Sequence, residues 1–253
     1  MARKPADARY SHRKPGDAAM NKLNLALLVL ISLVASGCAT TTSDPNRLNA
    51  FHDAQPTSIL VVPPMNEVTD VQATTSVLAT LPYFLGEKGF YVFPVNTVKT
   101  LLEYEGYYEP AEVHAAPPEQ LANLFKADAI LYVTIHEWTA KYMVFATTTQ
   151  VDFGYKLVSA DGALLWEERL QAEYSPNNNS SGGLIGLIVN AVEAAVERAD
   201  PTYIPLTKTV HARALVTPAG NSSNQGIPLG PYHPGYDGYY QRVVENGTDG
   251  KSE

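Results

Sequence analysis

Short apolar runs alternate with longer amphipathic stretches between residues 57 and 135. The runs at residues 58–62, 90–93 and 129–135 are rich in β-branched and aromatic side chains, which is typical of buried strands. Between these runs, apolar residues recur at spacings of three and four, so each intervening stretch predicts a helix with one packed face. The first half of the folded region is therefore expected to follow a β-α-β-α order.

The helices of this first half are predicted from their boundary residues. The first helix has Asp70 as its N-cap and ends at Gly89, because glycine readily adopts the conformation that closes a helix. Pro82 lies inside this helix and removes a backbone donor, so we expect a kink or a split there. The next two helices, separated by a polar turn, are expected to open with Asn96 as an N-cap and with the prolines at residues 117–118.

The pattern changes from helical spacing to strict alternation near residue 150. Apolar side chains occupy every second position of residues 151–157, which predicts a strand with one side facing water. Asp161 and Gly162 supply a hairpin turn, and the returning strand carries an apolar face of Leu164, Trp166, Leu170 and Ala172. The order of elements predicts the fold class α/β (α+β): a single mixed β-sheet with helices packed on it, its β-α-β-α start followed by antiparallel hairpin strands.

Two later segments are less regular. Residues 182–199 predict a helix that is apolar almost all round, which suits either a core helix packed on the sheet or an interface with a partner or a second copy. The glycines at its start lack the lysine and hydroxyl residues of a phosphate-binding loop. The Pro-, Gly- and Tyr-rich segment 218–253 predicts no regular element. Within it, residues 227–236 either dock on the domain or stay free, and residues 238–253 are expected to form a disordered tail.

The N-terminus contains the most specific chemical signal. Lys22, an apolar run over residues 23–34 and small residues lead to Cys38, the only cysteine of the chain. This arrangement resembles a bacterial lipoprotein signal that is cut before Cys38, with the new N-terminal cysteine then acylated. The run has 12 residues, whereas a spanning helix needs about 20. The alternative is a buried helix or a membrane span with Cys38 as an inert core thiol.

These signals divide the chain into four parts. Residues 1–37 are expected to be the signal peptide, with translation starting at the first methionine or at Met20. Residues 38–56 are too polar to order themselves and predict a flexible tether after the lipidated cysteine. Residues 57–217 are long enough for one globular domain, and residues 218–253 are the tail.

Charge narrows the class of partners. Cutting before Cys38 removes six basic and two acidic residues, so the net charge falls from −8 to −12. Such acidity argues against nucleic acid and against polybasic docking on anionic lipid, which leaves the acyl chains as the membrane anchor. Ala39 stands where enteric-type lipoproteins of the inner membrane tend to have aspartate. This resemblance favours the outer membrane, with the periplasmic face preferred to the cell surface.

Reactive residues do not assemble into a recognisable site. No glycine-flanked serine nucleophile occurs, and the adjacent Glu167 and Glu168 point to opposite faces of a strand. The histidines lie in the tether or in separate elements, without the spacing of a metalloprotease pair: His52, His114, His136 and His211. The sequence therefore predicts a non-enzymatic protein with no catalytic, cofactor-binding or metal-binding residues.

Several short sequence segments of the domain resemble a bacterial family of outer-membrane lipoproteins of unknown function. They are residues 59–64 with Asn66 and Glu67, residues 89–95, residues 127–132 and residues 230–232. The resemblance covers most of the chain after Cys38 and implies a fold similar to the N-terminal domain of TolB and to the lipoproteins CsgG and LpoB. It also implies a role in envelope assembly or transport, and it carries no catalytic residue over to this chain.

We therefore expect a lipoprotein, anchored in the outer membrane through Cys38, that binds other envelope lipoproteins, CsgG-like ones among them, in an assembly or transport complex. Homo-oligomers are compatible with the apolar helix at residues 182–199. One alternative is an accessory subunit of a CsgG-like secretion channel, which requires a ring of subunits or a long amphipathic hairpin. The other is a periplasmic enzyme or small-ligand binder, which requires a deep polar pocket.

Overall fold

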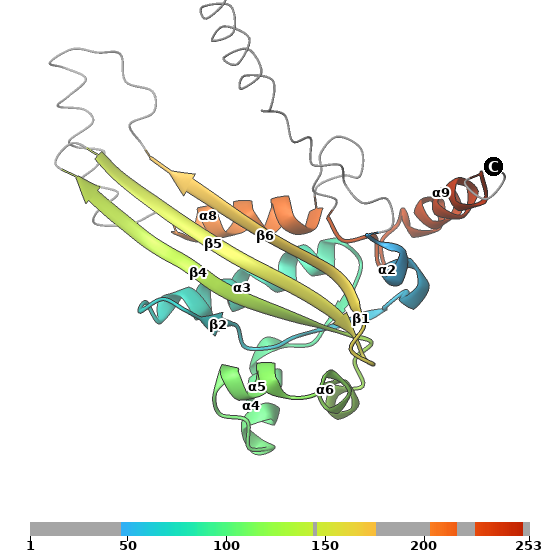
Figure 1. Ribbon diagram of the computed structural model, residues 1–253, viewed down its shortest axis with the longest axis horizontal. Helices are drawn as coiled ribbons and strands as arrows, with labels where there is room; N and C mark the ends of the chain where they lie inside the picture. Colours follow the sequence, from blue (N-terminus) through green and yellow to red (C-terminus); the bar gives the residue numbers. More distant parts are fainter. Residues whose placement is uncertain (1–46, 144–145, 176–202, 217–225, 250–253) are drawn as a thin grey trace, which may run out of the picture. The chain divides into compact units, whose positions relative to one another are not determined.

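The computed structural model describes residues 47–143, 146–175, 203–216 and 226–249 (Figure 1). All of them belong to one compact unit, Ser43–Glu253. The predicted signal peptide, Cys38 and the helix predicted at residues 182–199 lie outside the described residues.

Helices and strands follow one another in the expected mixed order. They are α2 (Asn49–Ala54), β1 (Ser58–Val61), β2 (Met65–Asn66), α3 (Gln72–Glu87), β3 (Tyr91–Val92), α4 (Val95–Tyr104), α5 (Pro110–Ala115), α6 (Pro118–Phe125), β4 (Ala129–Met143), β5 (Ala146–Ser159), β6 (Leu164–Tyr174), α8 (Tyr203–His211), the π-helical η2 (Ala212–Val216) and α9 (Tyr236–Asp249).

One six-stranded sheet organises these elements. Its strand order is β3-β1-β4-β5-β6, and β2 pairs with β4 beside β1. β1 runs parallel to β3 and β4, whereas β4, β5 and β6 are antiparallel neighbours. The prediction of a single mixed sheet, parallel at its start and antiparallel at its end, is confirmed.

The two faces of the sheet are covered unequally. The larger core cluster lies on the face where α2, α3 and α8 pack, and it contains the inward side chains of β5, namely Val151, Phe153, Tyr155 and Leu157. The smaller cluster joins β1 and the start of β4 to α4, α5 and α6. Figure 1 shows these three helices grouped at the end of the sheet where β4 begins, whereas α3 and α8 run behind the long strands. We call the remaining surface of β4, β5 and β6, on the side of α5 and α6, the open face.

β4 and β5 are about twice as long as predicted. Their outer halves pair with each other in register and are attached to the larger core through Trp138 and Val151. Side-chain hydrogen bonds cross all three strands there, because Lys141 donates to Gln150 and Gln150 donates to Glu173, each at 2.7 Å. Such cross-strand contacts cannot be recognised in one strand alone.

The returning strand β6 corrects one predicted side chain. Leu164 was expected to face the core but is 48% exposed, and Leu165 is buried instead. The register of β5 and β6 shifts between Leu157 and Val158, and this irregularity turns the first residue of β6 outward. The turn itself forms as predicted, with Gly162 at φ 88°.

The predicted tether is wrong for residues 47–56, because these residues belong to the folded domain. Leu48 and Phe51 belong to the larger core cluster, and Phe51 is fully buried in α2. His52, expected to be a solvated tether histidine, is hydrogen-bonded through Nε2 to the hydroxyl of Tyr239 in α9 at 2.8 Å. Two apolar residues three positions apart suffice to pack a short helix when a core is already present.

The C-terminal segment is also more ordered than predicted. Residues 227–236 dock on the domain: Ile227 is buried, and the backbone amide of Gly230 donates to the carbonyl of Lys88 at 2.7 Å. Residues 236–249 form the helix α9, so the predictions of no regular element and of a disordered tail are wrong for these residues.

The first half departs from prediction at two helix starts and at Pro82, and it contains two elements that were not predicted. α3 starts at Gln72, and the carboxylate of Asp70 accepts the amide of Gln72 at 2.8 Å; the helix then continues through Pro82. α4 starts at Val95 with Pro94 as its N-cap rather than Asn96, since the fixed φ of proline suits a helix start. The structure adds β2, and also α5, which is held by a capping box between Glu109 and Glu112.

We predict that Gly89→Ala strongly destabilises the protein. Gly89 has φ 85°, and an added Cβ would lie 2.2 Å from the backbone nitrogen of His233. The backbone strain alone costs about 1–3 kcal/mol, and the contact adds to it. Gly86→Ala is the matched control: a Cβ there meets nothing within 4 Å, and alanine in a helix gains about 0.5–1 kcal/mol. Urea unfolding curves measure both, and equal midpoints for Gly89→Ala and wild type would contradict the docked loop.

A second prediction concerns His211, which is fully buried in α8 and hydrogen-bonded through Nδ1 to the hydroxyl of Tyr155 at 2.7 Å. Burial lowers the pKa of His211 from 6.5 to about 3. The unfolded chain therefore takes up a proton at a pH where the folded chain does not. We expect full stability above the unfolded value and a loss of up to about 1.4 kcal/mol per pH unit as the pH falls toward the folded value.

His211→Gln removes the titrating group and keeps a hydrogen-bonding side chain. This variant should lose stability less steeply than wild type when urea unfolding is compared at neutral pH and near pH 5. Parallel pH profiles for the two proteins would mean that His211 is not the source of the acid sensitivity.

Candidate functional site

A hollow of about 820 Å³ lies on the open face, where the link between α5 and α6 faces the three long strands. Its wall is formed by the end of α5 and the start of α6, including His114, Ala116 and Pro118. Its floor is formed by β4, β5 and β6, with polar side chains and one glycine: Tyr132, Thr134, His136, Gly154, Lys156, Glu167 and Arg169. The hollow is therefore built from residues that lie up to 55 positions apart along the chain.

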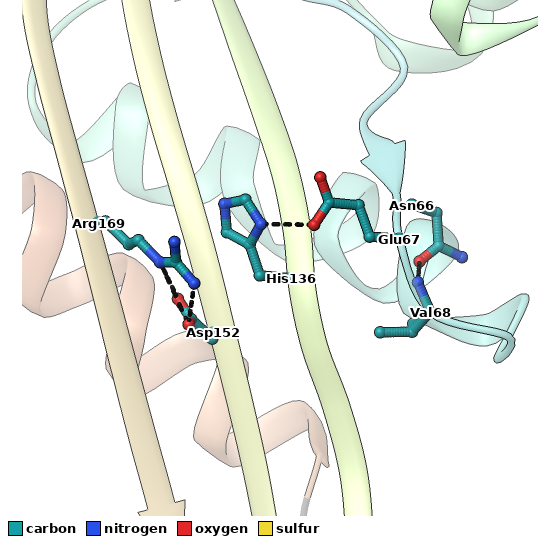
Figure 2. Close-up of polar contacts among 6 residues, drawn as sticks. All are labelled: Asn66, Glu67, Val68, His136, Asp152 and Arg169. Atoms are coloured by element: carbon teal, nitrogen blue, oxygen red, sulfur yellow. Dashed lines mark hydrogen bonds and ion pairs between the residues drawn. The ribbon is translucent and has the colours of Figure 1, made fainter.

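A β-bulge positions His136 at one end of the hollow. The register of β4 and β5 shifts between Ile135 and Glu137, so His136 is an extra residue without a partner in β5. Its Nδ1 is 2.7 Å from a carboxylate oxygen of Glu67, which follows β2 (Figure 2). A Cβ on Gly154 would lie 2.9 Å from Nε2 of His136. The absence of a side chain at Gly154 thus makes room for the imidazole.

The position of Glu67 is fixed by the turn after β2. The side chain of Asn66 accepts the amide of Val68 at 3.2 Å and donates to the carbonyl of Asp70 at 3.0 Å. Figure 2 shows Asn66, Glu67 and Val68 together beside β4. Asn66 therefore holds the loop that presents Glu67 to His136.

An arginine–carboxylate pair lies next to His136 on the neighbouring strands. Nε of Arg169 lies 3.1 Å from Oδ1 of Asp152, and a terminal nitrogen lies 2.8 Å from Oδ2, so the contact is bidentate (Figure 2). The side chain of Asp152 is 12% exposed and that of Arg169 is 62% exposed. The pair fixes the guanidinium at the edge of the hollow while leaving most of it open to a ligand.

Tyr132, in the floor beside this wall, carries a buried hydroxyl that lacks a partner among the described residues. The ring of Tyr132 packs edge-on against His114 at 5.0 Å, and no hydrogen-bond partner for its hydroxyl occurs among the described residues. Burial raises the pKa of Tyr132, so the hydroxyl stays protonated. His114 bonds through Nε2 to the carbonyl of Pro63 at 3.0 Å, and burial lowers the pKa of His114 despite that bond. A neutral imidazole in the wall therefore packs against a neutral tyrosine of the floor.

The structure places the residues considered from the sequence in three locations. His114 and His136, expected in separate elements, both line the hollow. His211 lies on the other face of the sheet, inside the larger core, and His52 lies against α9. Within residues 47–143, 146–175, 203–216 and 226–249, no group of three or more His, Cys, Asp or Glu side chains could hold a metal ion.

Glu167 and Glu168 have separate partners, as alternation along a strand requires. Glu167 pairs in register with Lys156 on the open face, whereas Glu168 pairs with Tyr155. The carboxylate of Glu168 is 2.9 Å from Arg47, which also donates to the backbone carbonyl of Glu167. Arg47 therefore attaches the start of the folded domain to the edge strand β6.

The groups in the hollow can form hydrogen bonds and ion pairs. Lys156 and Arg169 are donors, and Glu167 is an acceptor. None of the described helices is long and apolar enough to cross a membrane. Sequence reasoning missed the hollow, and its one local signal is Gly154, since glycine inside a strand often marks a bulge or a close approach.

Comparison with known proteins places this chain among lipoproteins. The family model described as "Putative lipoprotein GNA1162-like" matches residues 47–232. The "Putative lipoprotein NMB1124/NMB1162" of Neisseria meningitidis serogroup B is 36% identical over 215 residues, which is 84% of this chain and 96% of that protein.

Two solved structures are also similar. The crystal structure of lipoprotein GNA1162 from Neisseria meningitidis is 38% identical with a TM-score of 0.47, covering 56% of this chain and 99% of that one. The LpoB C-terminal domain from Salmonella enterica is 18% identical with a TM-score of 0.30, covering 47% of this chain and 84% of that one.

Gly154→Ala should rotate the ring of His136 and break its contact with Glu67. The added methyl group would stand 2.9 Å from Nε2, and the ring is the movable partner. The free energy of unfolding should change by no more than about 1 kcal/mol, because the ring lies at a partly exposed side-chain end. NMR chemical shifts of the His136 ring protons measure the displacement, with Gly86→Ala as the control. Unchanged shifts in Gly154→Ala would contradict the described packing.

Proposed function

The chain belongs to the GNA1162-like lipoprotein family, and on this premise we propose that it is a non-enzymatic lipoprotein of the outer membrane, anchored through acylated Cys38. There it binds other envelope proteins in an assembly or transport complex. The hollow on the open face is its binding surface.

The anchor is supported by the order of features around Cys38. A basic residue, an apolar run too short to span a bilayer and small residues precede the cysteine. One acyl chain binds a membrane only marginally, and two or more give a stable anchor. A chain whose net charge after cleavage is −12 has no electrostatic attraction to anionic lipid, so the acyl chains supply the membrane affinity.

The single observation that carries the binding role is the hollow with charged side chains held at its floor. Arg169 is fixed by its bidentate contact with Asp152, and Lys156 is exposed in register with Glu167. Charged groups that are already in place lose less side-chain entropy when a partner binds. Preorganised donors and acceptors at an uncovered sheet face suit a polar protein segment.

A small-ligand binder is the second candidate, and the volume of the hollow favours it. About 820 Å³ lies within the range of roughly 300–1,000 Å³ that is common for small-molecule sites. A protein partner would also contact the rim of the hollow, whereas a small ligand would not.

The anchor is tested by Cys38→Ser in the producing bacterium. We expect the variant to leave the outer-membrane fraction and to lack acyl chains in mass spectra, because serine cannot form the thioether that carries the lipid. Thr40→Ser is the matched control and should fractionate as wild type does. Cys38→Ser protein that still fractionates with the outer membrane would overturn the proposed anchor.

The binding surface is tested by crosslinking in cells followed by purification. Lys156→Glu reverses an exposed charge on the floor of the hollow and should reduce the recovery of partners at least several-fold. Lys208→Glu reverses an exposed charge on α8 and should leave recovery unchanged. Equal recovery from both variants would reject the hollow as the protein-binding surface, and the absence of any reproducible envelope partner would favour the small-ligand candidate.

A further inference from the structure

A tyrosine-rich surface lies beside α2, the first described helix of the domain. We call it the tyrosine surface; it consists of two exposed residues, Tyr232 and Val244, and of three partly buried tyrosines of α9, Tyr236, Tyr239 and Tyr240. We propose that this surface lies in the headgroup region of the membrane to which the lipid anchor attaches the domain. This inference rests on the proposed anchor at Cys38 and adds the orientation of the domain.

α9 is fixed to α2, the first helix of the domain. The hydroxyl of Tyr239 is 2.8 Å from Nε2 of His52, and the ring of Tyr240 meets the ring of His52 edge-on at 5.8 Å. Tyr236 adds a further ring contact with Tyr240 at 4.5 Å. The aromatic rings of α9 are thus organised around one side chain of α2.

The length of chain before Arg47 limits how far this surface can lie from the membrane. Arg47 is attached to β6 through Glu168, and α2 begins at Asn49. From Cys38 to Arg47 the chain advances nine residues, each spanning at most about 3.6 Å, so the reach is roughly 30 Å. The acyl chains of Cys38 must lie in the bilayer, so Arg47 stays within that distance of it, and α2 begins two residues after Arg47.

Tyrosine suits the boundary between lipid and water. Its ring is apolar and its hydroxyl is polar, and it is enriched where membranes meet water. Tyr232 is 70% exposed and Val244 is 64% exposed, so apolar area is available on this surface. Burial raises the pKa of Tyr239 and of Tyr240, so both hydroxyls remain neutral.

The space beside α9 also fits lipid headgroups. A hollow of about 540 Å³ is lined by Gln55 at the end of α2 and by Asp237, Tyr240, Gln241 and Val244. The amides of Gln55 and Gln241 and the hydroxyl of Tyr240 can donate hydrogen bonds to phosphate and glycerol oxygens, whereas the carboxylate of Asp237 can accept them from headgroup amines and hydroxyls. Since no basic cluster accompanies them, the contact depends on aromatic burial and on the anchor rather than on charge.

The test uses nitroxide labels on the complete acylated protein. The chain has one cysteine, which acylation consumes, so Tyr232→Cys and Val244→Cys each introduce a single free thiol. Tyr104→Cys on α4, where the native side chain is 85% exposed, is the matched control. The protein is reconstituted in vesicles of phosphatidylethanolamine and phosphatidylglycerol, and collisions of each label with oxygen and with a water-soluble nickel chelate are measured.

We expect the labels at positions 232 and 244 to show a several-fold higher ratio of oxygen to nickel collisions in vesicles than in the same variants carrying Cys38→Ser in solution. The label at position 104 should show no change. Acylated protein that floats with vesicles while all three labels stay equally exposed to nickel would overturn this inference and leave the anchor intact.

Two other outcomes are equally decisive. Protein that lacks acyl chains or fails to float would instead contradict the proposed anchor. Protection of positions 232 and 244 in the Cys38→Ser protein without vesicles would show that a second copy covers the tyrosine surface, and would reject the lipid as its occupant.

Discussion

The structure depends on the fact that β4, β5 and β6 have only one strongly apolar face. Their inward side chains, such as Phe153, Tyr155 and Trp166, are fully buried beneath α3 and α8. Burial of each such side chain contributes about 1.5–3 kcal/mol, so this face must be covered. On the other face, the intervening residues of these strands include charged side chains. Helices cover that face only where β1 and the start of β4 are apolar. The hollow lies where that coverage ends.

Much of this architecture follows from periodicity within single segments. A hydrophobic periodicity within the segment itself predicts each of several elements. These are the parallel strands at the start, the hairpin between β5 and β6, and the helices α3, α4 and α6. α2 and α9 do not, because their order depends on remote partners. Phe51 packs edge-on against Phe90 at 6.1 Å, and the tyrosines of α9 pack on His52. A polar segment with two well-placed apolar residues looks like a linker until the partner surface is known.

The hollow was beyond sequence reasoning for a different reason. His114 and His136 come together because α5 packs near β4 and the carbonyl of Pro63 holds the ring of His114. The bulge that frees His136 requires a mismatch of register with β5, which neither strand reveals alone. Gly154 marks the place, but its sequence context does not say which side chain will occupy the space.

The contact between Arg47 and β6 limits how far the domain can move from the proposed anchor. Together with the buried Leu48 and Phe51, it holds residue 47 to the domain, nine residues after Cys38. A short link to the anchor would confine a binding surface to a thin layer beside the bilayer, where the effective concentration of a partner in the same membrane reaches about the millimolar range. In such a layer even a weak pairwise affinity gives substantial occupancy.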